Sequence, residues 1–244
     1  MSNNNQPIQE INRSDYCRWI IRESGLPWLI LPHLVPWEQM LVEVEALDQT
    51  DWVKYRSGNS EGWWAAVIHG LEKRPWHWVK YAEEEGWKTE KDVPYGWTEV
   101  SKKCPFLTNY LQSSFGYNQH YRTRVLKVDP GGYIELHHDR DGGPDAPLER
   151  KDMSIGTWHF AIQQPEECDF IIPNWGVIPI ENGTTWLFNN KWEHTIINNS
   201  DKPRYHVLCN GGDRDMNFWS PKIIEGWQQF QSNYSKKIFP KIKL

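Results

Sequence analysis

Two side chains that could hold a metal ion stand two positions apart in the segment His137-His138-Asp139. In an extended strand, side chains at i and i+2 share a face, so His137 and Asp139 can face one object while His138, the rival ligand, points away. An imidazole and a carboxylate placed in this way form two corners of a 2-His-1-carboxylate facial triad, which binds non-heme Fe(II) and leaves coordination positions open. We expect His194 to supply the third corner, because it stands where a strand resumes after an Asn-rich turn.

A second chemical signal lies ten residues after His194. Arg204 opens an extended segment in which Arg204, His206 and Leu208 share one face. A guanidinium is a good bidentate partner for a carboxylate, and an unpaired buried cation is very costly. The sequence therefore predicts that Arg204 binds an anionic group, and a dicarboxylate cosubstrate would supply one.

The elements that must position these residues are short strands separated by turns. The turn Pro130-Gly131-Gly132 leads into the segment that carries His137, and similar turn signals separate the later runs. This spacing is typical of an all-β sandwich, a jelly roll or a cupin-like barrel. Strands are expected at residues 122–128, 134–139, 157–162, 170–172, 185–188, 195–198 and 204–210.

The first 120 residues have a different pattern. Helical spacing of apolar residues after Pro36 predicts an amphipathic helix, glycines bound an apolar strand at 62–70, and Pro105 opens a short helix. Residues 71–104 are charged, aromatic and turn-rich, and predict no regular element. We expect one domain with three parts. These are a helix-rich, Trp-rich N-terminal support over 1–120, a mainly β core over 121–212, and a C-terminal helix and tail over 213–244.

Composition narrows the function classes. The chain has 244 residues and a formal net charge of -5, so no basic field would recruit nucleic acid or an anionic membrane. No apolar run is long enough to cross a membrane, and the first thirty residues contain no signal-peptide core. The four cysteines are far apart in the sequence, which indicates free thiols in a reducing compartment. We therefore expect a cytoplasmic protein.

The order of the motifs resembles the Fe(II)/2-oxoglutarate-dependent oxygenases, and the surrounding sequence resembles their aspartyl/asparaginyl β-hydroxylase-like branch, which includes free-proline hydroxylases. The resemblance covers roughly residues 35–212 and is strongest after residue 120. The similar blocks are Pro130–Asp139, Trp158–Ile162, Gly183–His194 and Asn198–His206.

The resemblance implies a double-stranded β-helix of the jelly-roll or cupin-like kind. In it His137, Asp139 and His194 would bind Fe(II), Arg204 would hold the distal carboxylate of 2-oxoglutarate, and O2 would take the last coordination position. The implied activity is hydroxylation of an amino acid, free or within a peptide or protein. It would be coupled to oxidative decarboxylation of 2-oxoglutarate to succinate and CO2.

Two departures from the family pattern affect the cosubstrate site. The family often has Arg-x-His where this chain has Thr157-Trp158-His159, so a second oxoglutarate-binding arginine is missing there. We expect Thr157 and His159 to contribute to cosubstrate binding, with His206 beside Arg204 as a pocket residue. The stretch 140–156 is long, charged and rich in Gly and Pro, which suits a mobile lid.

Three further residues are candidates for substrate binding. Arg122 and Arg124 share a strand face and could bind a substrate carboxylate, or equally pair with Asp or Glu of a neighbouring loop. Trp186 is the third candidate for substrate binding.

The alternative function is a non-catalytic or non-oxygenase cupin-like protein that binds a metal or small ligand. A metal hydrolase or isomerase on the same barrel would be expected to recruit more histidines. A nucleic-acid demethylase is disfavoured by the acidic balance. The complete set of His137, Asp139, His194 and Arg204 favours the oxygenase.

Overall fold

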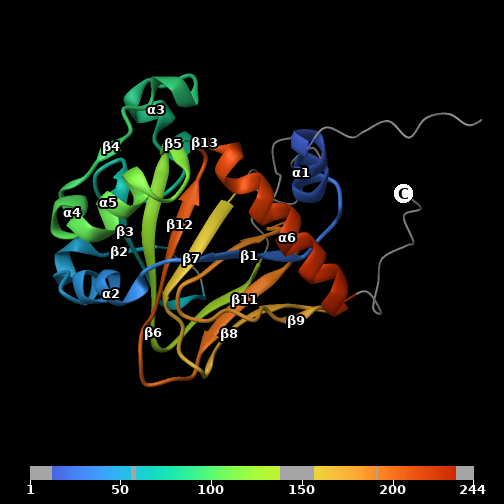
Figure 1. The fold of residues 1–244 in the computed structure, drawn as a ribbon. Coiled ribbons are helices and arrows are strands. Elements are labelled where there is room, and N and C mark those ends of the chain that lie inside the picture. Colours follow the sequence, from blue (N-terminus) through green and yellow to red (C-terminus); the bar gives the residue numbers. More distant parts are fainter. Residues whose placement is uncertain (1–12, 56–58, 138–156, 191, 235–244) are drawn as a thin grey trace, which may run out of the picture.

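The computed structural model describes residues 13–55, 59–137, 157–190 and 192–234. Its centre is an 11-stranded sheet in which the paired strands run antiparallel (Figure 1). The main path runs β1 (Trp28–Leu34), β10 (Thr184–Phe188), β7 (Thr157–Gln163), β12 (Arg204–Asn210), β6 (Arg122–His137), β11 (His194–Asn198), β8 (Cys168–Ile172) and β9 (Gly176–Val177). Off this path, β3 (Glu61–Gly70) pairs with β6, β2 (Val53–Lys54) and β4 (Gly96–Trp97), and a small second sheet joins β5 (Tyr117–Gln119) to β13 (Asp213–Arg214).

The long strand β6 belongs to both halves of the sheet. Its residues 122–128 pair with β12, whereas its residues 133–137 pair with β11. The turn between them needs glycine, because Gly131 has φ of +70° and a Cβ on Gly132 would lie 2.8 Å from the carbonyl oxygen of Asp129. The two strands that the sequence predicts on either side of this turn are thus one continuous strand. The strand order is that of a double-stranded β-helix, which confirms the expected fold class.

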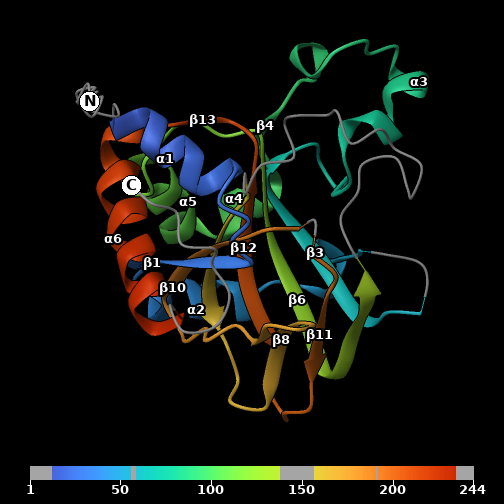
Figure 2. The same cartoon turned by 90° about the vertical axis from the view of Figure 1, so that its right-hand side faces the viewer.

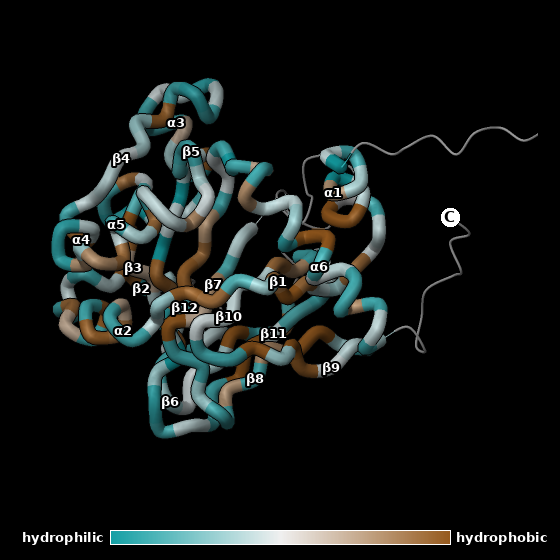
Figure 3. Tube along the Cα trace, viewed as in Figure 1, coloured by the Kyte–Doolittle hydropathy of each residue, from teal (hydrophilic) through white to brown (hydrophobic). Residues whose placement is uncertain are grey.

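Helices cover one face of the half-sheet formed by β10, β7, β12 and the start of β6. In Figure 2, α1 (Arg13–Arg22), α2 (Trp37–Glu45), α5 (Pro105–Ser113) and α6 (Met216–Tyr234) gather on this side, while α3 (Ala82–Glu85) stands on the other. Alternate residues of β12 that point to the helices, Tyr205, Val207 and Cys209, belong to the main hydrophobic core. Figure 3 shows hydrophobic colour in parts of both the strands and the helices, and hydrophilic colour in many of the outer loops. The opposite face of β12 is therefore left for polar chemistry.

The N-terminal region contributes more strand than the sequence indicates. The predicted helix after Pro36, the strand near 62–70 and the helix opening at Pro105 are confirmed as α2, β3 and α5. The strand β1 was not predicted, because its apolar run lacks the alternation that marks a half-buried strand; its pairing with β10 buries much of it. Residues 71–104 form only short elements: η2 (Trp78–Lys80), α3, η3 (Glu90–Asp92), β4 and α4 (Glu99–Lys103), with η1 (Gln49–Asp51) earlier in the chain.

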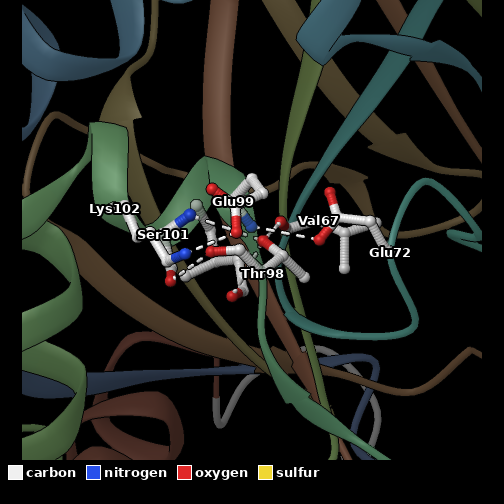
Figure 4. A network of polar contacts seen from close by, with 7 residues as sticks. Val67, Glu72, Thr98, Glu99, Ser101 and Lys102 are labelled. Carbon is white, nitrogen blue, oxygen red and sulfur yellow. Dashed lines mark hydrogen bonds and ion pairs between the residues drawn. The ribbon is translucent and has the colours of Figure 1, made fainter.

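A capped helix end fixes this irregular segment to the sheet. Thr98 precedes α4, and its hydroxyl accepts a hydrogen bond from the backbone N–H of Ser101 at 3.4 Å while donating to the carbonyl of Val67 on β3 (Figure 4). The carboxylate of Glu72 accepts from the N–H of Glu99 at 3.0 Å. The first N–H group of α4 is therefore bonded to a side chain from another segment, and the N–H of Ser101 is shared between the hydroxyl and the carbonyl of Thr98.

The remaining expectations concern the thiols and the membrane. All four cysteines are buried free thiols, and burial raises the pKa of each: Cys17, Cys104, Cys168 and Cys209. Among the described residues, no helix combines the length and the apolar character needed to span a bilayer.

Candidate active site

Strands β6 and β11 bring the two predicted histidine ligands together. His137 and His194 are register partners, and their ring centroids are 4.3 Å apart. The Nδ1 atom of His137 lies 2.7 Å from the carbonyl oxygen of Glu135, and that of His194 lies 3.0 Å from the carbonyl oxygen of Trp192. We assign the proton of each ring to Nδ1 from these contacts, which leaves the lone pair on Nε2, the form in which imidazole ligates a metal.

The third predicted ligand, Asp139, lies outside the described residues, as do His138 and the predicted lid at 140–156. Leu136 is 52% exposed, as expected for the position beside His137 that faces away from the site. The structure thus brings together two members of the predicted triad.

Aromatic rings surround the two histidines. The ring of Phe188 lies 4.8 Å from that of His194, and the ring of Phe170 lies 5.7 Å from it. On the other side, Trp63 of β3 lies 6.1 Å from His137. These apolar walls would keep bulk water from much of the space around a bound metal.

Arg204 lies completely buried on the inner face of β12. Its Nε donates to Gln164 Oε1 at 2.8 Å and its Nη1 contacts His206 Nδ1 at 2.5 Å, whereas Nη2 has no hydrogen-bond partner in the described part of the chain. Burial lowers the pKa of Arg204 to about 10, so it stays charged near neutral pH. A buried cation with an unused N–H group fits an incoming carboxylate.

His206 is the acceptor for Arg204. Burial, followed by the positive charge of Arg204, holds the pKa of His206 well below its usual value, so the ring is neutral. A neutral imidazole can accept through Nδ1, which agrees with the contact from the guanidinium. His206 therefore orients Arg204, as its place beside Arg204 in the sequence suggested.

No motif or spacing in the sequence pointed to Gln164. It follows β7 in a Gln-Pro turn, and its backbone N–H donates to Asn182 Oδ1 at 2.7 Å. Only the fold shows that this turn lies beside the first residue of β12.

Ring contacts connect the histidine pair to Arg204. His159 lies 5.1 Å from Phe188 and stacks on Trp186, with ring centroids 5.0 Å apart. Trp186 in turn has the Arg204 guanidinium carbon 5.9 Å from its ring. His159 and Trp186 thus lie between the histidine pair and Arg204.

Thr157 does not lie beside Arg204. Its hydroxyl accepts from the side chain of Asn210 at 3.0 Å, and Asn210 is the last residue of β12 whereas Arg204 is the first. At about 3.3 Å per residue, six residues of strand separate the two ends by roughly 20 Å. Thr157 therefore lies away from Arg204, because β7 and β12 run antiparallel, and its contribution to cosubstrate binding stays a prediction.

Arg124 lies at this other end of the sheet face. It is 2% exposed, and its guanidinium donates to the hydroxyl of Tyr55, the carbonyl of Pro75 and the side chain of Asn210. Arg122 is half-buried, and burial, followed by the neighbouring charge of Arg124, lowers its pKa to about 10. Within the described ranges, no ion pair joins either arginine to an Asp or Glu.

An apolar patch separates the two cationic ends. Ala65, Leu126 and Leu208 form a small cluster apart from the main core, with Tyr55 packed against it. Leu126 pairs with His206, and Leu208 pairs with Arg124, so the patch lies on the same sheet face as both arginines. This face therefore offers a carboxylate site at Arg204, an apolar floor, and a second cationic region at Arg122 and Arg124.

Comparisons with known proteins agree with this arrangement. The sequence model of the aspartyl/asparaginyl beta-hydroxylase family matches residues 37–212. None of the curated proteins compared with the chain matches it.

Three solved structures illustrate the similarity of fold. A 2OG-Fe(II) oxygenase family oxidoreductase from Burkholderia pseudomallei has 12% identity and a TM-score of 0.44, with 86% of this chain and 96% of that chain covered. The collagen prolyl hydroxylase of Paramecium Bursaria Chlorella virus-1 has 16% identity and a TM-score of 0.42, with 76% and 95% covered. A prolyl-4-hydroxylase from Pseudomonas putida has 12% identity and a TM-score of 0.43, with 82% and 100% covered. Because the family model matches most of the length of the chain, the chain belongs to the aspartyl/asparaginyl β-hydroxylase family.

Proposed function

We propose that the protein is an Fe(II)/2-oxoglutarate-dependent dioxygenase that hydroxylates an amino acid or an amino-acid residue. Its family membership makes it a hydroxylase of this mechanistic class. The observation that carries the proposal for this chain is the pairing of His137 with His194, which ring contacts connect to a buried arginine with an unused N–H group.

The residues fit the two groups that the reaction requires. His137, His194 and Asp139 would hold Fe(II), because two imidazoles and a carboxylate suit a non-heme iron site. Arg204 would hold the distal carboxylate of 2-oxoglutarate, since its guanidinium is buried and within the described residues forms no ion pair. When bound, the iron and the cosubstrate supply the oxidising chemistry with O2; the chain binds them, orients them and excludes water.

The second cationic region supports a substrate that carries a carboxylate. Arg122 and Arg124 lie beyond the apolar floor from Arg204, and burial lowers the pKa of Arg122. An anion between them would offset the cost of burying two neighbouring positive charges. An amino acid with an apolar side chain would match this combination, with its body over Leu126 and Leu208 and its carboxylate toward Arg122.

The test is a screen of amino acids and short peptides for succinate formation above the substrate-free rate. We expect a free amino acid to stimulate succinate formation, and the amide of the same amino acid to stimulate it much less, because the amide lacks the negative charge. The His194→Ala variant is the control and should form no succinate with any substrate. The proposal would be contradicted if the protein binds iron and 2-oxoglutarate but no tested compound stimulates succinate formation.

A further inference from the structure

Two buried N–H donors lie close together at the arginine end of the site, without an acceptor in the described part of the chain. One is Nη2 of Arg204 and the other is Nε1 of Trp186, and neither forms a hydrogen bond within the part of the chain that the structure describes. Both residues are 0% exposed, and the guanidinium carbon of Arg204 lies 5.9 Å from the Trp186 ring. A buried polar group left without a partner costs about 1–3 kcal/mol, so a pair of neighbouring donors indicates a missing acceptor.

The rest of the Arg204 guanidinium is already engaged. Nε donates to Gln164, and Nη1 donates to the neutral ring of His206. These two contacts fix the plane of the guanidinium and leave Nη2 as the nitrogen with no acceptor of its own. A carboxylate has two oxygens and about four acceptor sites, so a second donor beside Nη2 would satisfy the oxygen that Nη2 does not reach.

We propose that Trp186 is this second donor, and that its indole N–H binds the distal carboxylate of 2-oxoglutarate together with Arg204. This inference rests on the proposed function and gives Trp186 the role that the sequence suggested for Thr157. It replaces the expectation that Trp186 binds the substrate.

The fold holds Trp186 firmly for this role. Its strand, β10, lies between β1 and β7, and Trp186 pairs with Ile30 on one side and His159 on the other. His159 stacks on the indole with an interplanar angle of 24°. A donor whose ring is fixed by packing loses little entropy when it binds a ligand, and a hydrogen bond to a charged acceptor is stronger than one between neutral groups.

The unpartnered N–H alone does not single out Trp186. Trp158 is also buried, and its Nε1 also meets no acceptor among the described residues. Trp158 pairs with Leu187 and Cys209, on the sheet face that points into the main core, and Arg214 rather than Arg204 lies over its ring. The proximity to Arg204 is what distinguishes Trp186, and Trp158 provides a matched control.

The experiment is anaerobic calorimetry of 2-oxoglutarate binding to the Fe(II)-loaded protein. The Trp186→Phe variant keeps an aromatic ring but loses the N–H group, and we expect its affinity for 2-oxoglutarate to fall roughly 10- to 100-fold, as for a lost hydrogen bond to a charged group. Fe(II) affinity should be unchanged. The Trp158→Phe control should bind 2-oxoglutarate as the wild type does.

A second ligand locates the effect on the distal carboxylate. 2-Oxopentanoate has a methyl group where 2-oxoglutarate has that carboxylate, so Trp186→Phe should not weaken its binding. If Trp186→Phe does not fold, β-(3-benzothienyl)alanine can be placed at position 186, because it has the shape of the indole with sulfur in place of N–H. Unchanged 2-oxoglutarate affinity in a folded variant that lacks this N–H would overturn the inference. Failure of the wild type to bind 2-oxoglutarate would instead overturn the proposed function.

Discussion

Three arginines share one face of the sheet without a described acidic partner. Arg204 is held by the neutral groups of Gln164 and His206, and Arg124 by the hydroxyl of Tyr55, a backbone carbonyl and an amide. Neutral acceptors orient a guanidinium but leave its charge uncompensated in a poorly hydrated site. At the scale of single residues, the site is therefore prepared for anionic ligands.

Replacing Arg204 with Ala should separate cosubstrate binding from metal binding. We expect the affinity for 2-oxoglutarate to fall by roughly 100-fold or more, as when one partner of a buried charge pair is removed, while Fe(II) affinity changes little. Calorimetry with each ligand measures both quantities. Arg18→Ala is a suitable control because Arg18 is exposed on α1. Equal 2-oxoglutarate affinity in Arg204→Ala and the wild type would remove Arg204 from this role.

The sequence could predict residues whose position depends on one strand, and it could not predict contacts between strands. Alternation alone places Arg204 and His206 on one face of β12. The distance between Thr157 and Arg204 could not be predicted, because the spacing from Thr157 to His159 says nothing about the direction of β7 relative to β12. Gln164 could not be found for the same reason, since its contact with Arg204 joins a turn to a distant strand.

At the scale of elements, the turn in β6 connects the two half-sheets and places His137 five residues beyond Gly132. The Pro-Gly-Gly signal predicted a turn here but not that the strand continues through it. The approach of Glu61 on β3 explains the tight packing, because its carbonyl oxygen would lie 3.0 Å from a Cβ at Gly132. The strand β1 was missed because it becomes a strand only through its pairing with β10.

Gly132→Ala should therefore destabilise the fold. The added methyl group would meet two backbone carbonyl oxygens that cannot move aside independently, and such overpacking costs about 1–3 kcal/mol in free energy of unfolding. Urea denaturation checks this value. Gly96→Ala is the matched control, since a Cβ there meets no atom within 4 Å. Equal loss of stability in the two variants would show that the turn does not require the absence of a side chain at Gly132.

At the scale of the whole molecule, the half-sheet containing β12 has a helix-covered apolar face and a polar face that carries the site (Figure 2). Several histidines outside the site are buried or half-buried and neutral. Burial lowers the pKa of His33 and of His120 to about 4, and lowers the pKa of His69. His69 and His120 are buried, at 8% and 6% exposure.

These histidines should make the metal-free protein lose stability in acid. Between pH 6.5 and about 4 the unfolded chain binds more protons than the folded one, so the free energy of unfolding falls as pH falls, by about 1.4 kcal/mol per pH unit for each fully shifted histidine. Urea denaturation of the metal-free protein at pH 7.5, 6 and 5 measures this loss of stability. The free energy of unfolding of the His120→Gln variant should fall less steeply over the same pH range. An equal fall in the free energy of unfolding of the wild type and of His120→Gln would contradict the contribution of His120.

The most direct test of the account is an anaerobic titration of the metal-free protein with Fe(II) and then 2-oxoglutarate. Bidentate chelation of iron by the cosubstrate gives a weak visible charge-transfer band. We expect the band in the wild type, and we expect the His194→Ala variant to remain folded but to bind no iron and show no band. Iron binding that is unchanged in His194→Ala, or a wild type that binds iron but forms no band with 2-oxoglutarate, would contradict the proposed iron and cosubstrate site.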